Sequence, residues 1–77
     1  MPTILKAQGY RFFFYINDHG PPHIHVEKDR KTAKLDLTNC ELLRSKRFNA
    51  KEIGEIRNLV IENSELFKSK WDEYFGN

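Results

Sequence analysis

The sequence predicts an α+β fold, an antiparallel β-meander of about four strands backed on one face by a C-terminal helical pair or kinked helix. Hydrophobic side chains alternate with period two before Phe48 and recur every three or four residues after it. The 77 residues suffice for one domain, 1–77, with strands within 2–44 and helices within 49–75. Hydrophobic residues make up 39% of the chain, which is enough for a compact core.

The first half of the chain predicts strands at residues 2–6, 11–16, 23–28 and 32–37, with a brief last strand possible at 41–44. Turn residues separate them: Gly9 before the second strand, and the segment 17–22, rich in Gly, Pro, Asn and Asp, before the third. In the second strand Phe12, Phe14 and Ile16 share one face. Because neighbouring strands with short links pair antiparallel, a meander follows.

The alternation also assigns side chains to the two faces of the sheet. The inner face, which the helices should cover, would carry Phe12, Phe14, Ile24, Val26, Leu35 and Leu37. The open face would carry His23, His25, Glu27, Lys34 and Asp36.

The second half of the chain predicts helix. Asn49 is a favourable N-cap, and Glu52 three residues later completes a capping box. One apolar stripe follows at helical spacing, formed by Ile53, Ile56, Val60, Asn63, Phe67, Trp71 and Tyr74, with Trp71 expected on the inner face of the sheet. Because Asn63 is polar and Ser64 can cap a new helix, we expect a break there, and Gly76 should end the helix.

Charge is distributed unevenly about a net charge of +2. Residues 1–51 hold ten Lys/Arg against five Asp/Glu, whereas residues 52–77 hold three against six. A basic first half suits an anionic partner such as RNA or an acidic protein, although a well-solvated uneven surface is the simpler alternative. The candidate basic surface is Arg11, Lys34, Arg44, Lys46 and Arg47, with Tyr10, Phe13 and Tyr15 interleaved as possible stacking platforms for bases.

Cysteine usage and hydropathy indicate a cytoplasmic protein. Cys40 is the single cysteine, so neither a disulfide framework nor a cysteine metal cage is available. The N-terminal residues lack the pattern of a signal peptide, and the apolar run 12–16 is too short to span a bilayer. We therefore expect no membrane association.

The segment Asp18-His19-Gly20-Pro21-Pro22-His23-Ile24-His25-Val26-Glu27 contains all three histidines of the chain. Two residues apart on a strand, His23 and His25 should project to solvent from the same face, about 7 Å apart. The Pro21-Pro22 turn should bring His19 near them.

Three interpretations of this cluster remain open. The histidines could act as general acid and base, as phosphodiester cleavage requires, which would make His23, His25 and His19 the catalytic residues of a ribonuclease. They could bind a divalent metal such as zinc through His23 and His25, with His19, Asp18 or Glu27 completing the shell. They could also simply line a half-exposed face. No other cofactor is expected.

The chain resembles a family of small bacterial proteins classed as domain of unknown function 4160. The resemblance rests on Pro2-Thr3-Ile4, Gly9, the aromatic strand, the motif Asp18-His19-x-Pro21-Pro22-His23-x-His25-Val26 and the ending Trp71-x-x-Tyr74-Phe75-Gly76. It implies a bacterial protein whose gene often lies beside that of another small protein (domain of unknown function 2442), as in a toxin–antitoxin-type module. It implies no catalytic residues.

Two functions of different class follow. The first is a toxin-like effector that contacts RNA through a histidine-bearing basic sheet face and is paired with the antitoxin-like product of an adjacent gene. The second is a non-catalytic protein-interaction module, whose open sheet face and two-sided apolar strand 11–16 pair with another protein or form a homodimer.

Overall fold

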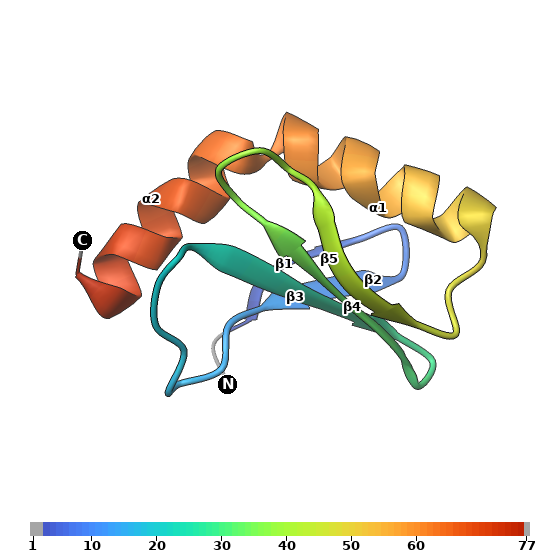
Figure 1. The fold of residues 1–77 in the computed structure, drawn as a ribbon, viewed down its shortest axis with the longest axis horizontal. Coiled ribbons are helices and arrows are strands. Elements are labelled where there is room, and N and C mark those ends of the chain that lie inside the picture. Colours follow the sequence, from blue (N-terminus) through green and yellow to red (C-terminus); the bar gives the residue numbers. More distant parts are fainter. Residues whose placement is uncertain (1–2, 77) are drawn as a thin grey trace.

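The computed structural model describes residues 3–76 and consists of an antiparallel sheet followed by two helices (Figure 1). The strands are β1 (Thr3–Ala7), β2 (Tyr10–Phe13), β3 (His23–Lys28), β4 (Lys31–Asp36) and β5 (Leu42–Lys46), and they lie in the sheet in chain order. The helices are α1 (Ala50–Glu62) and α2 (Ser64–Phe75), both on one side of the sheet. The predicted α+β meander with a C-terminal helical pair is confirmed. The sheet has five strands, because the brief segment expected at 41–44 is a full fifth strand.

The core lies between the sheet and the helices, as the alternation predicted. All six residues assigned to the inner face, Phe12, Phe14, Ile24, Val26, Leu35 and Leu37, are 0% exposed. From the helices, Ile56, Leu59, Val60, Phe67 and Trp71 join the same buried cluster. The stripe prediction failed at Tyr74, which is exposed, whereas Phe75 packs on Trp71 with ring centroids 4.3 Å apart.

The predicted helix break is present, but Ser64 does not cap the second helix. The capping box of Asn49 and Glu52 starts α1 as expected. At the break, the Asn63 side chain donates back to the Leu59 carbonyl at 2.8 Å, and Ser64 is already the first helical residue of α2. The side chain of Asn63 thus satisfies a carbonyl at the end of α1, and its backbone carbonyl accepts the first hydrogen bond of α2, from the Phe67 N–H. Gly76, in the left-handed region at φ 68°, ends α2.

Strand β2 ends three residues earlier than predicted. Asp18 accepts a hydrogen bond from the backbone N–H of Tyr15 at 2.9 Å, and its own N–H donates to the Tyr15 carbonyl. This turn takes Ile16 out of the sheet, and Ile16 is 82% exposed instead of inward-facing.

Of the predicted first strand, Pro2 lies outside the described residues, while Thr3 to Lys6 are in β1. Within residues 3–76, neither helix has the length and apolarity that crossing a bilayer requires.

Tyr10 provides a test of how the sheet is joined to α1. Tyr10 is 1% exposed, and its hydroxyl donates to Glu55 Oε1 at 2.7 Å. Burial, together with the Glu55 carboxylate, raises the pKa of Tyr10 to about 12. Because this pKa is raised in the folded state, Tyr10 ionises at lower pH in the unfolded chain than in the folded one. Its contribution to the free energy of unfolding is therefore complete below pH 10 and is lost as the pH rises to about 12.

We therefore expect the free energy of unfolding to fall by about 2 kcal/mol across that interval because of Tyr10 alone. Urea unfolding at a series of alkaline pH values measures the loss, and Tyr10→Phe should remove this part of the slope. The matched control is Tyr74→Phe, on the exposed side of α2. Parallel pH profiles for Tyr10→Phe and the parent would contradict the assignment.

Candidate functional site: a histidine–aspartate cluster beside a basic cavity

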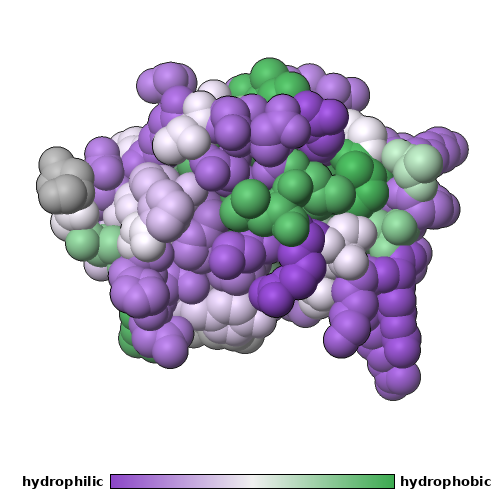
Figure 2. Space-filling model, viewed as in Figure 1, coloured by the Kyte–Doolittle hydropathy of each residue, from purple (hydrophilic) through white to green (hydrophobic). Residues whose placement is uncertain are grey.

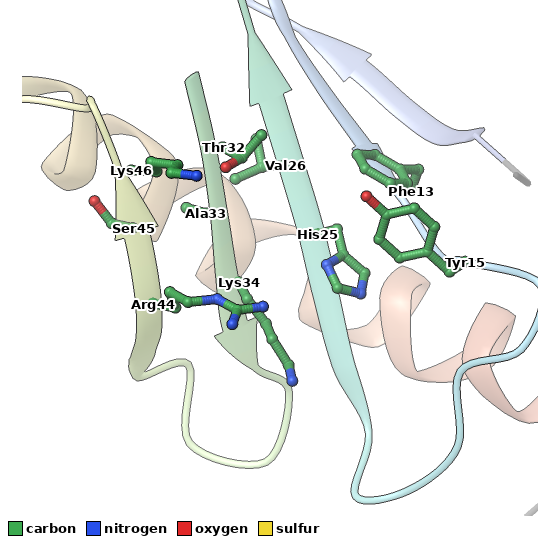
Figure 3. A pocket seen from close by; sticks show the side chains of 10 residues that line it. All are labelled: Phe13, Tyr15, His25, Val26, Thr32, Ala33, Lys34, Arg44, Ser45 and Lys46. Carbon is green, nitrogen blue, oxygen red and sulfur yellow. The ribbon is translucent and has the colours of Figure 1, made fainter. Parts of the chain in front are cut away.

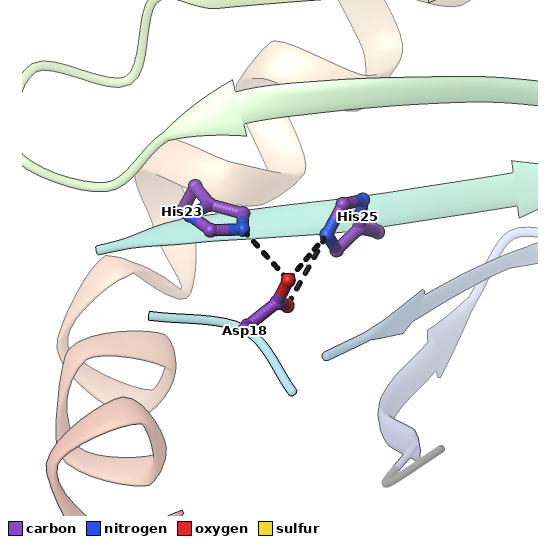
Figure 4. A group of neighbouring side chains, drawn as sticks. All are labelled: Asp18, His23 and His25. Carbon is purple, nitrogen blue, oxygen red and sulfur yellow. Dashed lines mark hydrogen bonds and ion pairs between the residues drawn. The ribbon is translucent and has the colours of Figure 1, made fainter. Parts of the chain in front are cut away.

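The loop between β2 and β3 carries Asp18 across the start of β3. The turn at Tyr15 aims the Asp18 carboxylate at the two histidines of that strand (Figure 4). The Asp18 side chain is mostly buried. Although burial works in the opposite direction, the hydrogen bond from the Tyr15 backbone and the interactions with His23 and His25 lower the pKa of Asp18. A carboxylate is therefore fixed between the two imidazoles.

His23 is enclosed, with its side chain 8% exposed. Its Nδ1 lies 2.9 Å from the Pro21 carbonyl oxygen, and because a carbonyl can only accept, Nδ1 donates. Its Nε2 lies 3.2 Å from Asp18 Oδ1. The ring also packs against Trp71 of α2, with centroids 5.0 Å apart. Both ring nitrogens are thus committed to neighbouring atoms of the protein.

His25 is held by aromatic rings on the open face. Its imidazole stacks on Phe13 at 5.5 Å between centroids and meets the Tyr15 ring at 4.6 Å. Its Nε2 lies 3.2 Å from Asp18 Oδ2. Burial lowers the pKa of His25, and the nearby Asp18 carboxylate opposes that shift only in part. The neutral imidazole is therefore favoured.

The prediction that His23 and His25 project to solvent was wrong. The period of two placed them correctly on one face, but the loop carrying Asp18 and the ring of Trp71 cover that face at its edge. A simple acid–base pair is not supported by this geometry, because both Nε2 atoms face the same carboxylate and not an open substrate position.

The other residues proposed for the cluster have different positions. Of the three candidates to complete a metal shell, Asp18 converges with the two histidines, with ligand atoms all within 4.8 Å of one another. Glu27 instead forms an ion pair with Arg11. His19 is exposed and lines, together with Asp18 and His23, a neighbouring cavity of about 300 Å³.

A second cavity, of about 410 Å³, opens on the exposed face of the sheet (Figure 3). Its lining residues combine aromatic rings and cations: Phe13, Tyr15, His25, Val26, Thr32, Ala33, Lys34, Arg44, Ser45 and Lys46. Figure 3 shows Phe13 and Tyr15 on one side of His25 and the cationic side chains on the other. Tyr15 is 40% exposed and so can be reached by a ligand.

The cations of this cavity lie close together on neighbouring strands. Lys34 is directly opposite Arg44 in the pairing of β4 with β5, and opposite His25 in the pairing with β3. Like charges directly opposite each other destabilise a sheet. Within residues 3–76, neither Lys34, Arg44 nor Lys46 forms an ion pair with a carboxylate. This arrangement favours binding of an anion.

The structure brings together only some of the predicted basic and aromatic residues. Lys34, Arg44 and Lys46 line the cavity, whereas Arg47 is exposed outside its lining. Arg11 is paired with Glu27 and lies over the Phe13 ring at 4.2 Å. Tyr10 cannot serve as a stacking platform, because it is buried against α1 on the inner face.

Sequence reasoning missed the contact between His23 and Trp71. The two residues are far apart in the chain, and Trp71 was assigned only to the core. The motif spacing carries no signal for this contact, which depends on where α2 ends over the sheet.

Fold and site together define a small α+β protein whose five-stranded sheet carries a His–Asp cluster and a basic, aromatic cavity on the face opposite the helices. A family model described as "Domain of unknown function (DUF4160)" matches residues 9–72, and the chain belongs to this family. The match includes Asp18, His23, His25 and the whole lining of the basic cavity. No curated protein and no solved structure matches the chain.

Proposed function

We propose that this protein is an effector that binds single-stranded RNA on the open face of its sheet. The observation that carries the proposal is the cavity in which Lys34, Arg44 and Lys46, unpaired by carboxylates among the described residues, lie beside an exposed tyrosine. Proteins that bind single-stranded RNA commonly use cationic side chains to contact the phosphates and aromatic rings to stack on the bases. A cavity of about 410 Å³ falls in the size range of small-ligand sites and suits one nucleotide.

The proposal includes a role as the toxin-like member of a two-gene module. Its support is the family resemblance, and the antitoxin-like partner would be the product of an adjacent gene. Such a partner would be expected to present carboxylates to Lys34 and Arg44 and so compete with RNA. Ribonuclease chemistry is not part of the proposal.

Salt dependence tests RNA binding directly. With three cations on phosphates, the logarithm of affinity should fall with a slope of roughly −2 against the logarithm of salt concentration, about twentyfold for a fourfold rise in salt. Fluorescence anisotropy of a labelled oligouridylate measures it. Lys34→Glu combined with Arg44→Glu should abolish binding, and Tyr15→Leu should weaken it by roughly tenfold or more through lost stacking.

The matched control is Lys51→Glu combined with Lys68→Glu, on the helices. It changes the net charge by the same amount and should bind RNA like the parent if the sheet face is the site. Equal losses in the two double variants would mean that net charge alone drives binding. Failure of the parent to bind at low salt would overturn the proposal.

A second candidate function is protein binding, favoured by exposed leucines on the edge strand. All of β5 is exposed, including Leu42 and Leu43, and Leu43 borders the cavity that contains Asp18 and His23. Figure 2 shows an apolar strip amid a largely hydrophilic surface, in the part of the view where Figure 1 draws β5 and α1. An exposed edge strand can pair with a strand of a partner. Absence of RNA binding in the salt experiment would leave this function as the better supported one.

A further inference from the structure

We propose that Asp18, His23 and His25 form a binding site for one divalent first-row transition-metal ion, with zinc as the ion to test. The inference is independent of RNA binding. It starts from convergence: two imidazole Nε2 atoms and one carboxylate, brought from a loop and a strand, lie within 4.8 Å of one another (Figure 4).

The distances from the two imidazoles to the carboxylate match those between metal ligands, although His25 Nε2 also lies within hydrogen-bonding distance of Asp18 Oδ1, at 3.4 Å. Both His23 Nε2 and His25 Nε2 lie 3.2 Å from the nearest Asp18 oxygen. A hydrogen bond between an imidazolium and a carboxylate is shorter, about 2.7–2.9 Å. Ligand atoms bound to zinc at about 2.0–2.1 Å in a tetrahedron are separated by about 3.3 Å.

The outer hydrogen bonds of His23 and Asp18 are of the kind that orients metal ligands. His23 donates from its other ring nitrogen, Nδ1, to the Pro21 carbonyl at 2.9 Å, which orients Nε2 toward the cluster. The Tyr15 N–H orients the Asp18 carboxylate at 2.9 Å. Packing against Trp71 and Phe13 fixes the two imidazole planes. Either a proton on Nε2 or a metal ion must lie between this nitrogen and the Asp18 carboxylate, and the three converging ligand atoms offer a position for the metal ion.

The donor set selects the class of ion. Two imidazoles with one carboxylate suit zinc and other first-row ions, whereas magnesium and calcium prefer oxygen ligands. Three protein ligands leave a fourth position open in a tetrahedral site. In this cluster that position would be filled by a water molecule or another small ligand.

Zinc binding to the tag-free, full-length chain tests the site. Equilibrium dialysis against zinc chloride should give one zinc per chain, and zinc should raise the melting temperature because only the folded state assembles the site. In long-range proton–nitrogen NMR spectra, the Nε2 resonances of His23 and His25 should shift on zinc addition. Those of exposed His19 should not.

Two variants and one control identify the ligands. Asp18→Asn keeps an acceptor for the Tyr15 N–H, and His25→Gln keeps a polar side chain at the site; each should weaken zinc binding at least about tenfold. His19→Ala, the third histidine of the chain, should bind zinc as the parent does. Circular dichroism checks that each variant is folded. A parent without stoichiometric zinc, or zinc binding unchanged in both Asp18→Asn and His25→Gln, would overturn the proposal and leave an ion-paired cluster.

Discussion

Replacing Trp71 by alanine is expected to lower the free energy of unfolding by about 3–5 kcal/mol, a large share of what a domain of this size has. The indole is buried and joins α2 to the sheet. It meets Phe14 of the core edge-on at 5.3 Å between centroids, and it packs on His23. Its removal leaves a cavity between the two layers that α2 alone cannot fill.

Urea unfolding followed by far-ultraviolet circular dichroism measures the loss without relying on tryptophan fluorescence. The control is Tyr74→Ala, three residues further along the same helix and 50% exposed, for which the expected change is below about 1 kcal/mol. If the two variants unfolded at the same urea concentration, the position of α2 over Phe14 would be wrong.

The faces of the sheet were predictable because alternation is a local property. In the strand from His23 to Lys28, the period of two is enough to separate Ile24 and Val26 from the histidines. The capping box at Asn49 was equally local. An error arose in the strand before β3, where a polar side chain bonds to the backbone of a residue three positions earlier. Asp18 draws the backbone of Tyr15 into a turn and so exposes Ile16.

The sequence predicted which residues form the candidate site, but not how far they are buried. The motif identified His23 and His25 and offered Asp18 as one possible partner, and the structure brings these three together. Periodicity assigns a residue to a face without saying what covers that face. The covering groups are a loop and a ring from α2, so the burial of His23 is set by tertiary packing that no local pattern encodes.

That burial makes His23 the second position where a large loss of stability is expected. In metal-free protein, His23→Ala should lower the free energy of unfolding by about 3 kcal/mol, because a buried polar network loses its central member. The Pro21 carbonyl and Asp18 Oδ1 would each lose their contact with the imidazole. Trp71 would also lose a ring packed against it.

Urea unfolding in the presence of a chelator separates this structural role from metal binding. His19→Ala, in the same loop region but exposed, should change stability by no more than about 0.5 kcal/mol. Adding zinc should then stabilise the parent and His19→Ala but not His23→Ala, since an alanine supplies no ligand. A His23→Ala variant as stable as the parent in chelator would show that Asp18 and Pro21 do not depend on the imidazole. The solvent-facing histidine pair predicted from the sequence would then describe the protein better than the enclosed cluster does.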